Sequence, residues 1–186
     1  MSRFSFTNLS LNGLNRIESW PVEDSRGSFV RMFCSEELKA IGWDKPITQV
    51  NLTCTKFKGT VRGLHFQRQP YAEMKLVSCT HGEVWDVVVD LRANSKTFLQ
   101  WHAEILSRKN GYSLLIPEGF AHGFQALTDE VQMLYFHSER YDPSSEGGLN
   151  PNDPLLNISW PLGITQLSSR DQAHPVLNSE FTGIIS

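Results

Sequence analysis

Hydrophobic residues along the chain recur at every second position or in short continuous apolar runs, and both patterns are typical of β-strands. Six segments of this kind are rich in β-branched and aromatic residues: 47–56, 74–80, 83–91, 101–106, 113–116 and 131–136. Glycine and proline punctuate them at 81–82, 110–111, 117–119 and 142–143. Such short, regular spacing predicts a mostly β fold of the sandwich or barrel type.

Helical signal is sparse, and the segment 35–41 is the best candidate for a helix. Ser35 can act as its N-cap, and Glu36 and Glu37 suit the positive end of the helix dipole. Gly42 is placed to end it. The sequence therefore predicts a β-protein with few short helices.

The length and charge of the chain limit the classes of protein to consider. With 186 residues and 40% hydrophobic content, the sequence predicts one domain over residues 1–186. A formal net charge of -3 argues against a nucleic-acid partner. The first fifteen residues contain no long apolar run, so we expect neither a signal peptide nor a membrane span. We therefore expect a cytoplasmic protein.

The three cysteines indicate neither a disulfide framework nor a zinc site. Cys34, Cys54 and Cys79 are odd in number and lack C-x-x-C spacing. We expect them to be small buried hydrophobic residues.

Residues 117–122, Pro-Glu-Gly-Phe-Ala-His, match the P-x-G-x-x-H turn of the double-stranded β-helix, or cupin, in which the histidine enters the barrel mouth. Metal-binding cupins add an H-x-H pair and a glutamate, because a divalent ion needs several converging ligands. Here the second position of that pair is Gln67, a poor ligand, which leaves His65, Glu73 and His122 as candidates. We therefore expect no bound metal, with a metal-dependent cupin oxygenase as an alternative.

A longer match covers residues 59–67, Gly-Thr-Val-Arg-Gly-Leu-His-Phe-Gln. This segment resembles the G-x-x-R-G-L-H-[YF]-Q signature of the dTDP-4-dehydrorhamnose 3,5-epimerase family. Further matches extend over nearly the whole chain: 24–29, 48–51, 75–77, 82–92, 116–124, Tyr135, Tyr141, 153–154, 158–161 and 167–171. The resemblance implies a cupin-type jelly-roll barrel, no cofactor, and a homodimer with exchanged N-terminal strands. It also implies that the segment after Trp160 closes the site.

The chemistry of the family explains the residue types at four positions. A 4-keto group acidifies the protons on the neighbouring sugar carbons, so a base can remove one and leave an enolate. The resemblance implies that His65 is this base and that Asp171 fixes its tautomer. It implies that Tyr135 reprotonates the opposite face and that Lys75 stabilises the enolate oxygen. Taken alone, Asp171 would be a solvated surface acid, Tyr135 an inward-facing strand aromatic and Lys75 an exposed lysine.

The resemblance also implies a set of residues that bind the nucleotide diphosphate and the sugar. Arg26 and Phe29 match positions that reach the nucleotide from the neighbouring subunit. The remaining matches, all expected within one chain's site, are Gln49, Asn51, Arg62, His122, Tyr141, Glu146 and Arg170.

The function implied is inversion of C3, C5 or both in a nucleotide-linked 4-keto-6-deoxy sugar during deoxysugar and polysaccharide biosynthesis. The leading substrate is dTDP-4-dehydro-6-deoxyglucose. Residues 70–74 and Arg170 depart from the family pattern, which leaves open a mono-epimerase for a CDP-, GDP- or UDP-linked sugar. A ketoisomerase and a non-catalytic sugar-binding module are further alternatives; the module would not need the pair His65 and Asp171.

Overall fold

The computed structural model describes residues 2–185 and confirms a mostly β fold with two short helices among them. The strands are β1 (Phe4–Asn8), β2 (Asn15–Ser19), β3 (Val22–Asp24), β4 (Gly27–Phe29), β5 (Gln49–Thr55), β6 (Val61–Gln67), β7 (Lys75–His81), β8 (Glu83–Asp90), β9 (Trp101–Ser107), β10 (Tyr112–Ile116), β11 (Phe120–Ala126), β12 (Val131–His137) and β13 (Glu146–Gly148). The helices are α1 (Ser35–Lys39) and α2 (Ser169–Ala173). All six strands predicted from the hydrophobic pattern are present.

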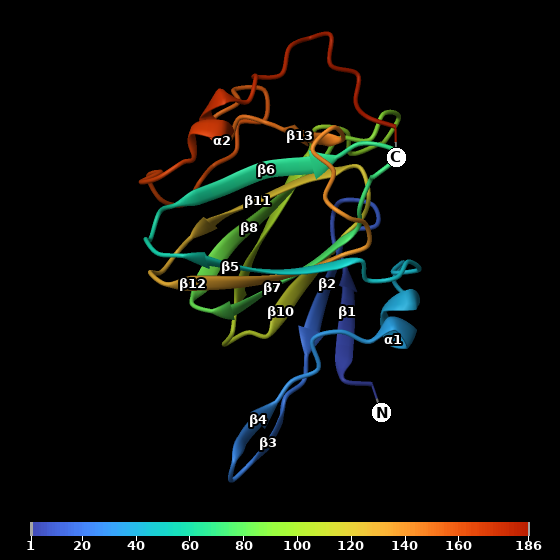
Figure 1. Ribbon diagram of the computed structural model, residues 1–186, viewed down its shortest axis with the longest axis vertical. Helices are drawn as coiled ribbons and strands as arrows, with labels where there is room; N and C mark the ends of the chain where they lie inside the picture. The colour runs from blue at the N-terminus through green and yellow to red at the C-terminus, as the bar shows by residue number, and fades with distance from the viewer. Residues whose placement is uncertain (1, 186) are drawn as a thin grey trace.

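Two antiparallel sheets face each other and form the barrel (Figure 1). The larger has the strand order β1-β2-β10-β7-β12-β5, and the smaller has the order β13-β6-β11-β8-β9. Their facing side chains form one buried cluster, in which Val77 and Met133 of the larger sheet meet Val88 and Phe124 of the smaller. Period-two alternation on each strand directs these residues inward. The result is a barrel, as the hydrophobic pattern predicted, with the jelly-roll architecture that the resemblance implied.

Residues after Trp160 cover the outer face of the smaller sheet. Val87 and Val89 of β8 point away from the barrel interior into a second cluster, against Ile184 and other residues of the C-terminal segment. Strand β8 is thus buried on both faces, which accounts for its continuous apolar sequence. In Figure 1 this segment, drawn in red, lies next to β6 at the top of the view.

Helix α1 covers the outer face of the larger sheet, and its ends differ from the expectation. Cys34, not Ser35, is the N-cap, and it makes no side-chain capping hydrogen bond. The assignment of Ser35 as N-cap was therefore wrong by one residue, because Ser35 already has helical geometry. Buried Leu38 packs with Trp43 and stabilises the helix instead. Gly42, with φ +107, reverses the chain after the helix as predicted.

The expectation of three buried cysteines is correct for Cys79 alone. Cys34 is half-buried and Cys54 is exposed. Strand β5 is at the edge of its sheet, and its alternate residues, Cys54 among them, face outward. The exposure of Cys54 therefore follows from the position of β5 at the sheet edge, and this position cannot be predicted from the number and spacing of the cysteines.

The N-terminal region divides into two parts. Strands β1 and β2 complete the larger sheet of the same chain, since β2 pairs with β10. Strands β3 and β4 form a separate hairpin that projects away from the barrel (Figure 1). Within residues 2–185, neither helix has the length and apolar character that crossing a membrane requires.

Candidate active site

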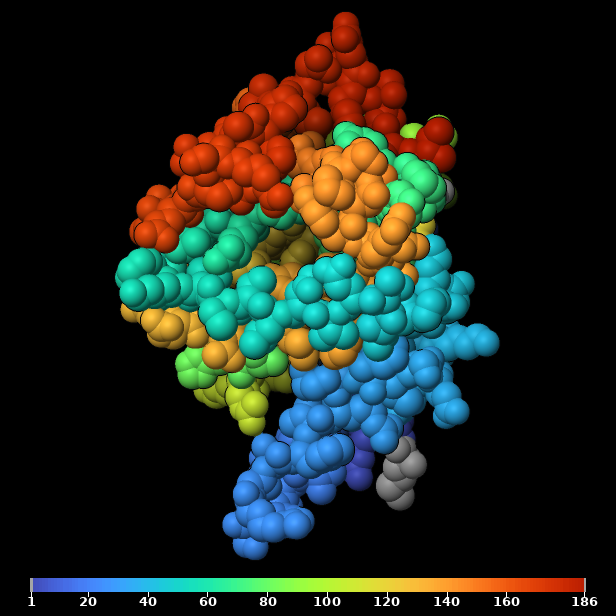
Figure 2. Space-filling view, viewed as in Figure 1, coloured from blue at the N-terminus to red at the C-terminus, as the bar shows by residue number. Residues whose placement is uncertain are grey.

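A cavity of about 960 Å³ lies inside the barrel, with residues of both sheets and of the C-terminal segment in its wall. Its mouth is the hollow between β5 and β6 in Figure 2. Most of the site residues predicted from sequence line it: Asn51, Arg62, His65, Lys75, His122, Tyr135, Tyr141, Glu146, Arg170 and Asp171. The fold therefore brings together groups that span more than a hundred positions of the chain.

His65 and Asp171 form a hydrogen-bonded pair in the cavity wall. Nε2 of His65 lies 2.7 Å from Oδ1 of Asp171. Oδ2 of Asp171 accepts a hydrogen bond of 3.3 Å from the backbone N–H of Gly63. A carboxylate held at both oxygens fixes the imidazole with its proton on Nε2, so Nδ1 has a free lone pair.

The local sequence of α2 places Asp171 beside His65. Ser168 is the N-cap of this helix, and its hydroxyl accepts a hydrogen bond of 3.0 Å from the N–H of Asp171. Asp171 is only 3% exposed. Burial by itself raises the pKa of its carboxyl, but the hydrogen bond and charge of His65, aided by Gly63 and Ser168, outweigh burial and hold the pKa below its usual value. Asp171 is therefore a buried anion, in contrast to the surface acid expected from composition.

Two glycines allow β6 and β11 to approach closely at this point. A Cβ on Gly63 would lie 2.6 Å from Cα of Gly123, and a Cβ on Gly123 would lie 2.6 Å from the carbonyl oxygen of Arg62. No side chain fits in that space. The close approach places His65 opposite His122 in the register of the two strands.

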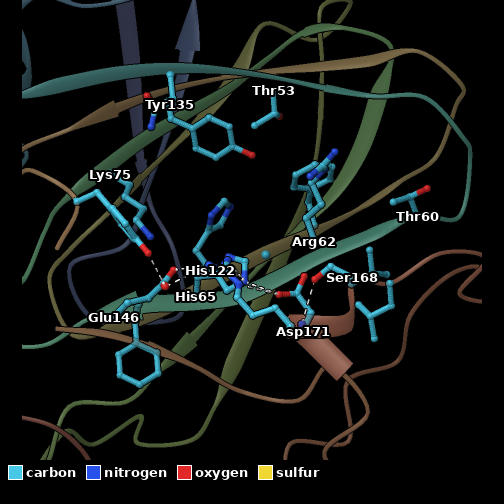
Figure 3. A pocket seen from close by; sticks show the side chains of 18 of the residues that line it. Thr53, Thr60, Arg62, His65, Lys75, His122, Tyr135, Glu146, Ser168 and Asp171 are labelled. Atoms are coloured by element: carbon cyan, nitrogen blue, oxygen red, sulfur yellow. Dashed lines mark hydrogen bonds and ion pairs between the residues drawn. The ribbon is translucent and has the colours of Figure 1, made fainter. Parts of the chain in front are cut away.

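Tyr135 reaches the cavity from the opposite sheet (Figure 3). Its ring packs edge-on to His122, with 6.1 Å between the ring centres. Burial raises the pKa of the Tyr135 phenol well above its ordinary value, so the hydroxyl stays protonated at neutral pH. Tyr135 can thus donate a proton from the larger sheet, on the side of the cavity opposite His65.

His122 is held by Asp86 beneath the cavity. Nε2 of His122 lies 2.8 Å from Oδ2 of Asp86, and both side chains are buried. Burial raises the pKa of the Asp86 carboxyl, an effect that the neighbouring His122 reduces. Sequence reasoning missed Asp86, although Val84, Asp86 and Val88 alternate on β8, and a charged residue between two inward-facing valines is a detectable signal.

Lys75 belongs to a polar network at the other end of the cavity. It is 8% exposed, and its Nζ lies 3.1 Å from Oε1 of Glu73. Oε2 of Glu73 lies 2.7 Å from Nδ1 of His137, whose Nε2 lies 3.3 Å from Nδ2 of Asn51. Burial raises the pKa of the Glu73 carboxyl, but the charge of Lys75 and the hydrogen bond with His137 outweigh burial and lower it. Lys75 is therefore buried beside an anion, not exposed as its residue type alone suggests.

Sequence reasoning missed His137 and considered Glu73 only as a metal ligand. His137 lies two positions after Tyr135 on β12, so the period of the strand places both on one face. Their rings stack, with 6.0 Å between centres. The period of the strand could therefore have placed His137 beside Tyr135 from the sequence alone.

Glu146, Arg170 and Tyr141 meet at the cavity mouth. Nη1 of Arg170 lies 3.1 Å from both carboxylate oxygens of Glu146. The Tyr141 hydroxyl donates a 2.9 Å hydrogen bond to Oε2 of Glu146, and this bond is the main cause of a raised pKa of the Tyr141 phenol. Gln49 lies outside the cavity wall, and its side-chain oxygen accepts a hydrogen bond from the N–H of Tyr141. These groups surround a space that can hold a polar ligand.

Arg62 borders the same cavity from β6. Its Nε donates a 2.9 Å hydrogen bond to Oγ1 of Thr55, and its Nη2 donates to the carbonyl oxygen of Cys54. The guanidinium is exposed and carries donors for an anionic ligand.

Arg26 and Phe29 are not part of the cavity wall of their own chain. Both lie on the β3–β4 hairpin, where Arg26 pairs with Asp24 and Phe29 is 70% exposed. The structure of one chain thus separates these two residues from the other predicted site residues.

The residues at the cupin metal positions do not converge on a common point. The Gln67 amide donates to the carbonyl oxygens of Tyr71 and Arg140, and its oxygen accepts from the N–H of Asp142. His65, Glu73 and His122, the other three candidates, are each engaged by a different partner, as described above. This donor set does not fit a cupin oxygenase centre.

Comparisons with known proteins agree with this geometry. Residues 8–179 match the family model described as dTDP-4-dehydrorhamnose 3,5-epimerase. A dTDP-4-dehydrorhamnose 3,5-epimerase of Salmonella typhimurium is 43% identical over 83% of this chain and 85% of its own length. A dTDP-4-dehydrorhamnose 3-epimerase of Streptomyces niveus is 39% identical over 88% of this chain and 79% of its own. Among solved structures, the chain is similar to dTDP-6-deoxy-D-glucose-3,5-epimerase from Legionella pneumophila, crystallised in complex with dTDP-4-keto-L-rhamnose. The two sequences are 37% identical, and the match covers 98% of this chain and 99% of the other. The two structures superpose with a TM-score of 0.91.

Proposed function

The chain belongs to the dTDP-4-dehydrorhamnose 3,5-epimerase family, and we propose that it inverts C3 and C5 of dTDP-4-keto-6-deoxyglucose. The observation that carries the proposal is the placement of the His65–Asp171 pair and Tyr135 on opposite sides of one cavity, with Lys75 also in its wall. A base and an acid on opposite faces are what inversion of a carbon centre requires.

The first step is removal of a proton from the carbon next to the keto group. Nδ1 of His65 takes the proton, and the electrons of the C–H bond move to the carbonyl oxygen. Asp171 stabilises the imidazolium that forms, because its carboxylate lies 2.7 Å from the other ring nitrogen. The Lys75 ammonium supplies positive charge that stabilises the enolate oxygen. A preorganised charge of this kind lowers the barrier by about 3 kcal/mol.

The second step is reprotonation on the opposite face. Tyr135 donates its phenolic proton to the carbon, and the enolate electrons return to form the ketone. Tyr135 regains a proton from water, and His65 releases the one it took. The protons balance over the cycle without a redox partner, and the same groups act on C3 and C5 in turn.

Polar groups at the cavity mouth support recognition of the nucleotide diphosphate. We assign the diphosphate to the exposed guanidinium of Arg62 and to donors near it, because arginine meets phosphate oxygens in a fork. Glu146 and Arg170 neutralise each other at 3.1 Å and border the same opening, next to Tyr141. A nucleotide-sugar substrate also fits the cytoplasmic location that the sequence predicts.

The exposed hairpin supports a homodimer in which Arg26 and Phe29 complete the partner's site. Phe29 is 70% exposed, and the outward face of the edge strand β5 presents Val50 at 52% and Leu52 at 57%. An edge strand and apolar side chains left in water are features that a second copy would cover. Figure 2 shows β5 and the β3–β4 hairpin on the same face of the molecule.

The test of the function is incubation with dTDP-4-keto-6-deoxyglucose in D₂O, followed by NMR. Deuterium at both C3 and C5, with formation of dTDP-4-keto-L-rhamnose, is the expected result. Deuterium at one carbon alone would identify a mono-epimerase instead. Repeating the assay with UDP-, CDP- and GDP-linked 4-keto sugars determines the nucleotide, and a preference for one of these over dTDP would overturn that part of the proposal.

A further inference from the structure

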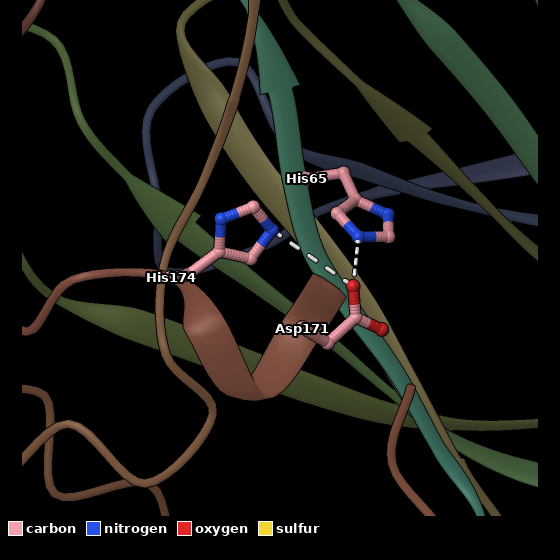
Figure 4. A group of neighbouring side chains, drawn as sticks. All are labelled: His65, Asp171 and His174. Atoms are coloured by element: carbon pink, nitrogen blue, oxygen red, sulfur yellow. Dashed lines mark hydrogen bonds and ion pairs between the residues drawn. The ribbon is translucent and has the colours of Figure 1, made fainter. Parts of the chain in front are cut away.

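Two histidines flank one carboxylate oxygen, that of Asp171, beside the cavity (Figure 4). Oδ1 of Asp171 lies 2.7 Å from Nε2 of His65 and 3.8 Å from Nε2 of His174. The three ligand atoms all lie within 4.8 Å of one another. His174 is the C-cap of α2, so it lies one turn beyond Asp171, whereas His65 comes from β6.

Nε2 of His174 is a buried nitrogen without a hydrogen-bond partner among the described residues. Its distance of 3.8 Å from Asp171 is too long for a hydrogen bond. The ring lies so close to Gly148 that a Cβ there would overlap it, and Gly148 is the residue opposite His65 in the pairing of β13 with β6. The fold therefore holds an unsatisfied imidazole nitrogen toward the pair formed by His65 and Asp171.

The distances suit a small tetrahedral cation. Zinc takes imidazole nitrogen and carboxylate oxygen at about 2.0–2.2 Å, so two tetrahedral ligand atoms lie about 3.3 Å apart. The two distances to Oδ1 of Asp171, 2.7 and 3.8 Å, bracket that value. The two imidazole nitrogens need to approach each other by at most about 1.5 Å. Two histidines and one carboxylate also leave the fourth tetrahedral position for a water molecule.

We propose that His65, Asp171 and His174 bind Zn²⁺, and that the bound ion inhibits the enzyme by occupying its base. The inhibitory part rests on the proposed function, in which His65 removes the substrate proton. The binding part rests only on the three side chains.

The charge of Arg170 opposes the ion. Its Nη2 lies 3.1 Å from Nε2 of His65, and its Nε lies 3.8 Å from Oδ1 of Asp171. Glu146 draws the guanidinium toward itself through Nη1, and the Arg170 side chain is 53% exposed, so it has room to swing away. Arg170→Gln is therefore expected to tighten Zn²⁺ binding, a change opposite to that of removing a ligand.

Inhibition follows from the tautomer of His65. Zinc binds the lone pair of Nε2, so the single N–H proton of the neutral ring, which Nε2 otherwise donates to Asp171, moves to Nδ1. A protonated Nδ1 has no lone pair to accept the substrate proton. Removal of the ion by a chelator restores the original tautomer and the activity.

The experiment is calorimetric titration of the full-length wild type with ZnCl₂, together with Co²⁺ absorption as a report of tetrahedral geometry. We expect one Zn²⁺ per chain and an inhibition midpoint that matches the dissociation constant. His174→Ala should weaken binding at least about tenfold, since it removes one of three ligands. Its activity without Zn²⁺ should stay within about twofold of wild type, because His174 takes no part in the proposed reaction. Gly148→Ala, which displaces the His174 ring, should weaken binding in the same direction.

His102→Ala is the matched control, because His102 also pairs with a carboxylate, that of Glu104, at 3.0 Å. We expect it to bind Zn²⁺ as wild type does. Equal affinity of wild type and His174→Ala would overturn the site. Zinc that binds through His174 yet leaves the wild type fully active would overturn the block of the base. Calorimetry and Co²⁺ absorption need no substrate, so they test the site even if the chain proves inactive on every nucleotide sugar.

Discussion

Nε2 of His65 lies 2.7 Å from Oδ1 of Asp171, although 106 positions separate the two residues in the chain. Strand β6 carries the histidine and the short helix α2 carries the aspartate. Because Gly63 holds the second carboxylate oxygen, the pair has one orientation, with Nδ1 of His65 as the base. The predictions below depend on this pair and on the groups around it.

His65→Asn should abolish deuterium incorporation at both C3 and C5, because one base serves both carbons. A general base contributes about 10²- to 10⁴-fold, so the loss should be of at least that order. NMR in D₂O reads the two carbons separately. His81→Asn, an exposed histidine at the end of β7, is the control and should exchange as wild type does. Wild-type exchange at either carbon in His65→Asn would require a second base.

Tyr135→Phe should retain proton exchange into the substrate better than it retains net inversion. Without the phenol, His65 can still take a proton and return one to the same face, but nothing donates to the opposite face. The ratio of deuterium exchange to product formation measures the difference, and we expect it to rise at least about tenfold. An unchanged ratio would show that Tyr135 is not the acid.

Asp171→Asn should destabilise the fold by an amount that depends on pH. The folded-state pKa of Asp171 lies below its ordinary value of 3.8, so its ionised form stabilises the folded state above pH 3.8. This contribution disappears as the pH falls below 3.8 through the lowered pKa. Urea unfolding at pH 7 should give a loss of about 1.5–3 kcal/mol, typical of a hydrogen bond to a charged group, and a smaller loss at pH 3. A difference that stays constant between these pH values would contradict the prediction.

Complementation between two inactive variants should test whether the hairpin serves the partner's site. In a mixture of Arg26→Ala and His65→Asn chains, a mixed dimer combines the intact His65 of one chain with the intact Arg26 of the other. After unfolding and refolding together, half of the dimers are mixed and each has one of two sites intact, so activity should reach about a quarter of wild type. Sedimentation checks that the variants remain dimeric. No recovery from a dimeric mixture would place Arg26 outside the partner's site.

Exhaustive chelation should leave the epimerase fully active, because Lys75 supplies the positive charge that stabilises the enolate. Activity is measured after EDTA treatment and buffer exchange, and again after addition of Mg²⁺, Mn²⁺ or Fe²⁺ in turn. Loss of activity with EDTA, followed by recovery with one of these ions, would refute a metal-free reaction.

Several features of the fold and site were accessible from the sequence. Period-two hydrophobicity located six of the strands, and the family resemblance of the segment 59–67 pointed to His65 as the base. The same period could have placed His137 beside Tyr135, since strand geometry puts residues i and i+2 on one face. The N-cap of α1 was misplaced by one residue because packing of Leu38, not side-chain capping, stabilises that helix.

What the sequence determined by itself was local: which segments form strands, where the chain turns, and which chemical groups are present. These follow from side-chain alternation and from the backbone preferences of glycine and proline. Only the tertiary structure decided that Asp171 is buried against His65, that Glu73 lies between Lys75 and His137, and that His174 faces the same carboxylate as His65. The physical reason is that burial and pairing of charges depend on which distant elements pack together, and the non-periodic segment after Trp160 gives no local signal of where it packs.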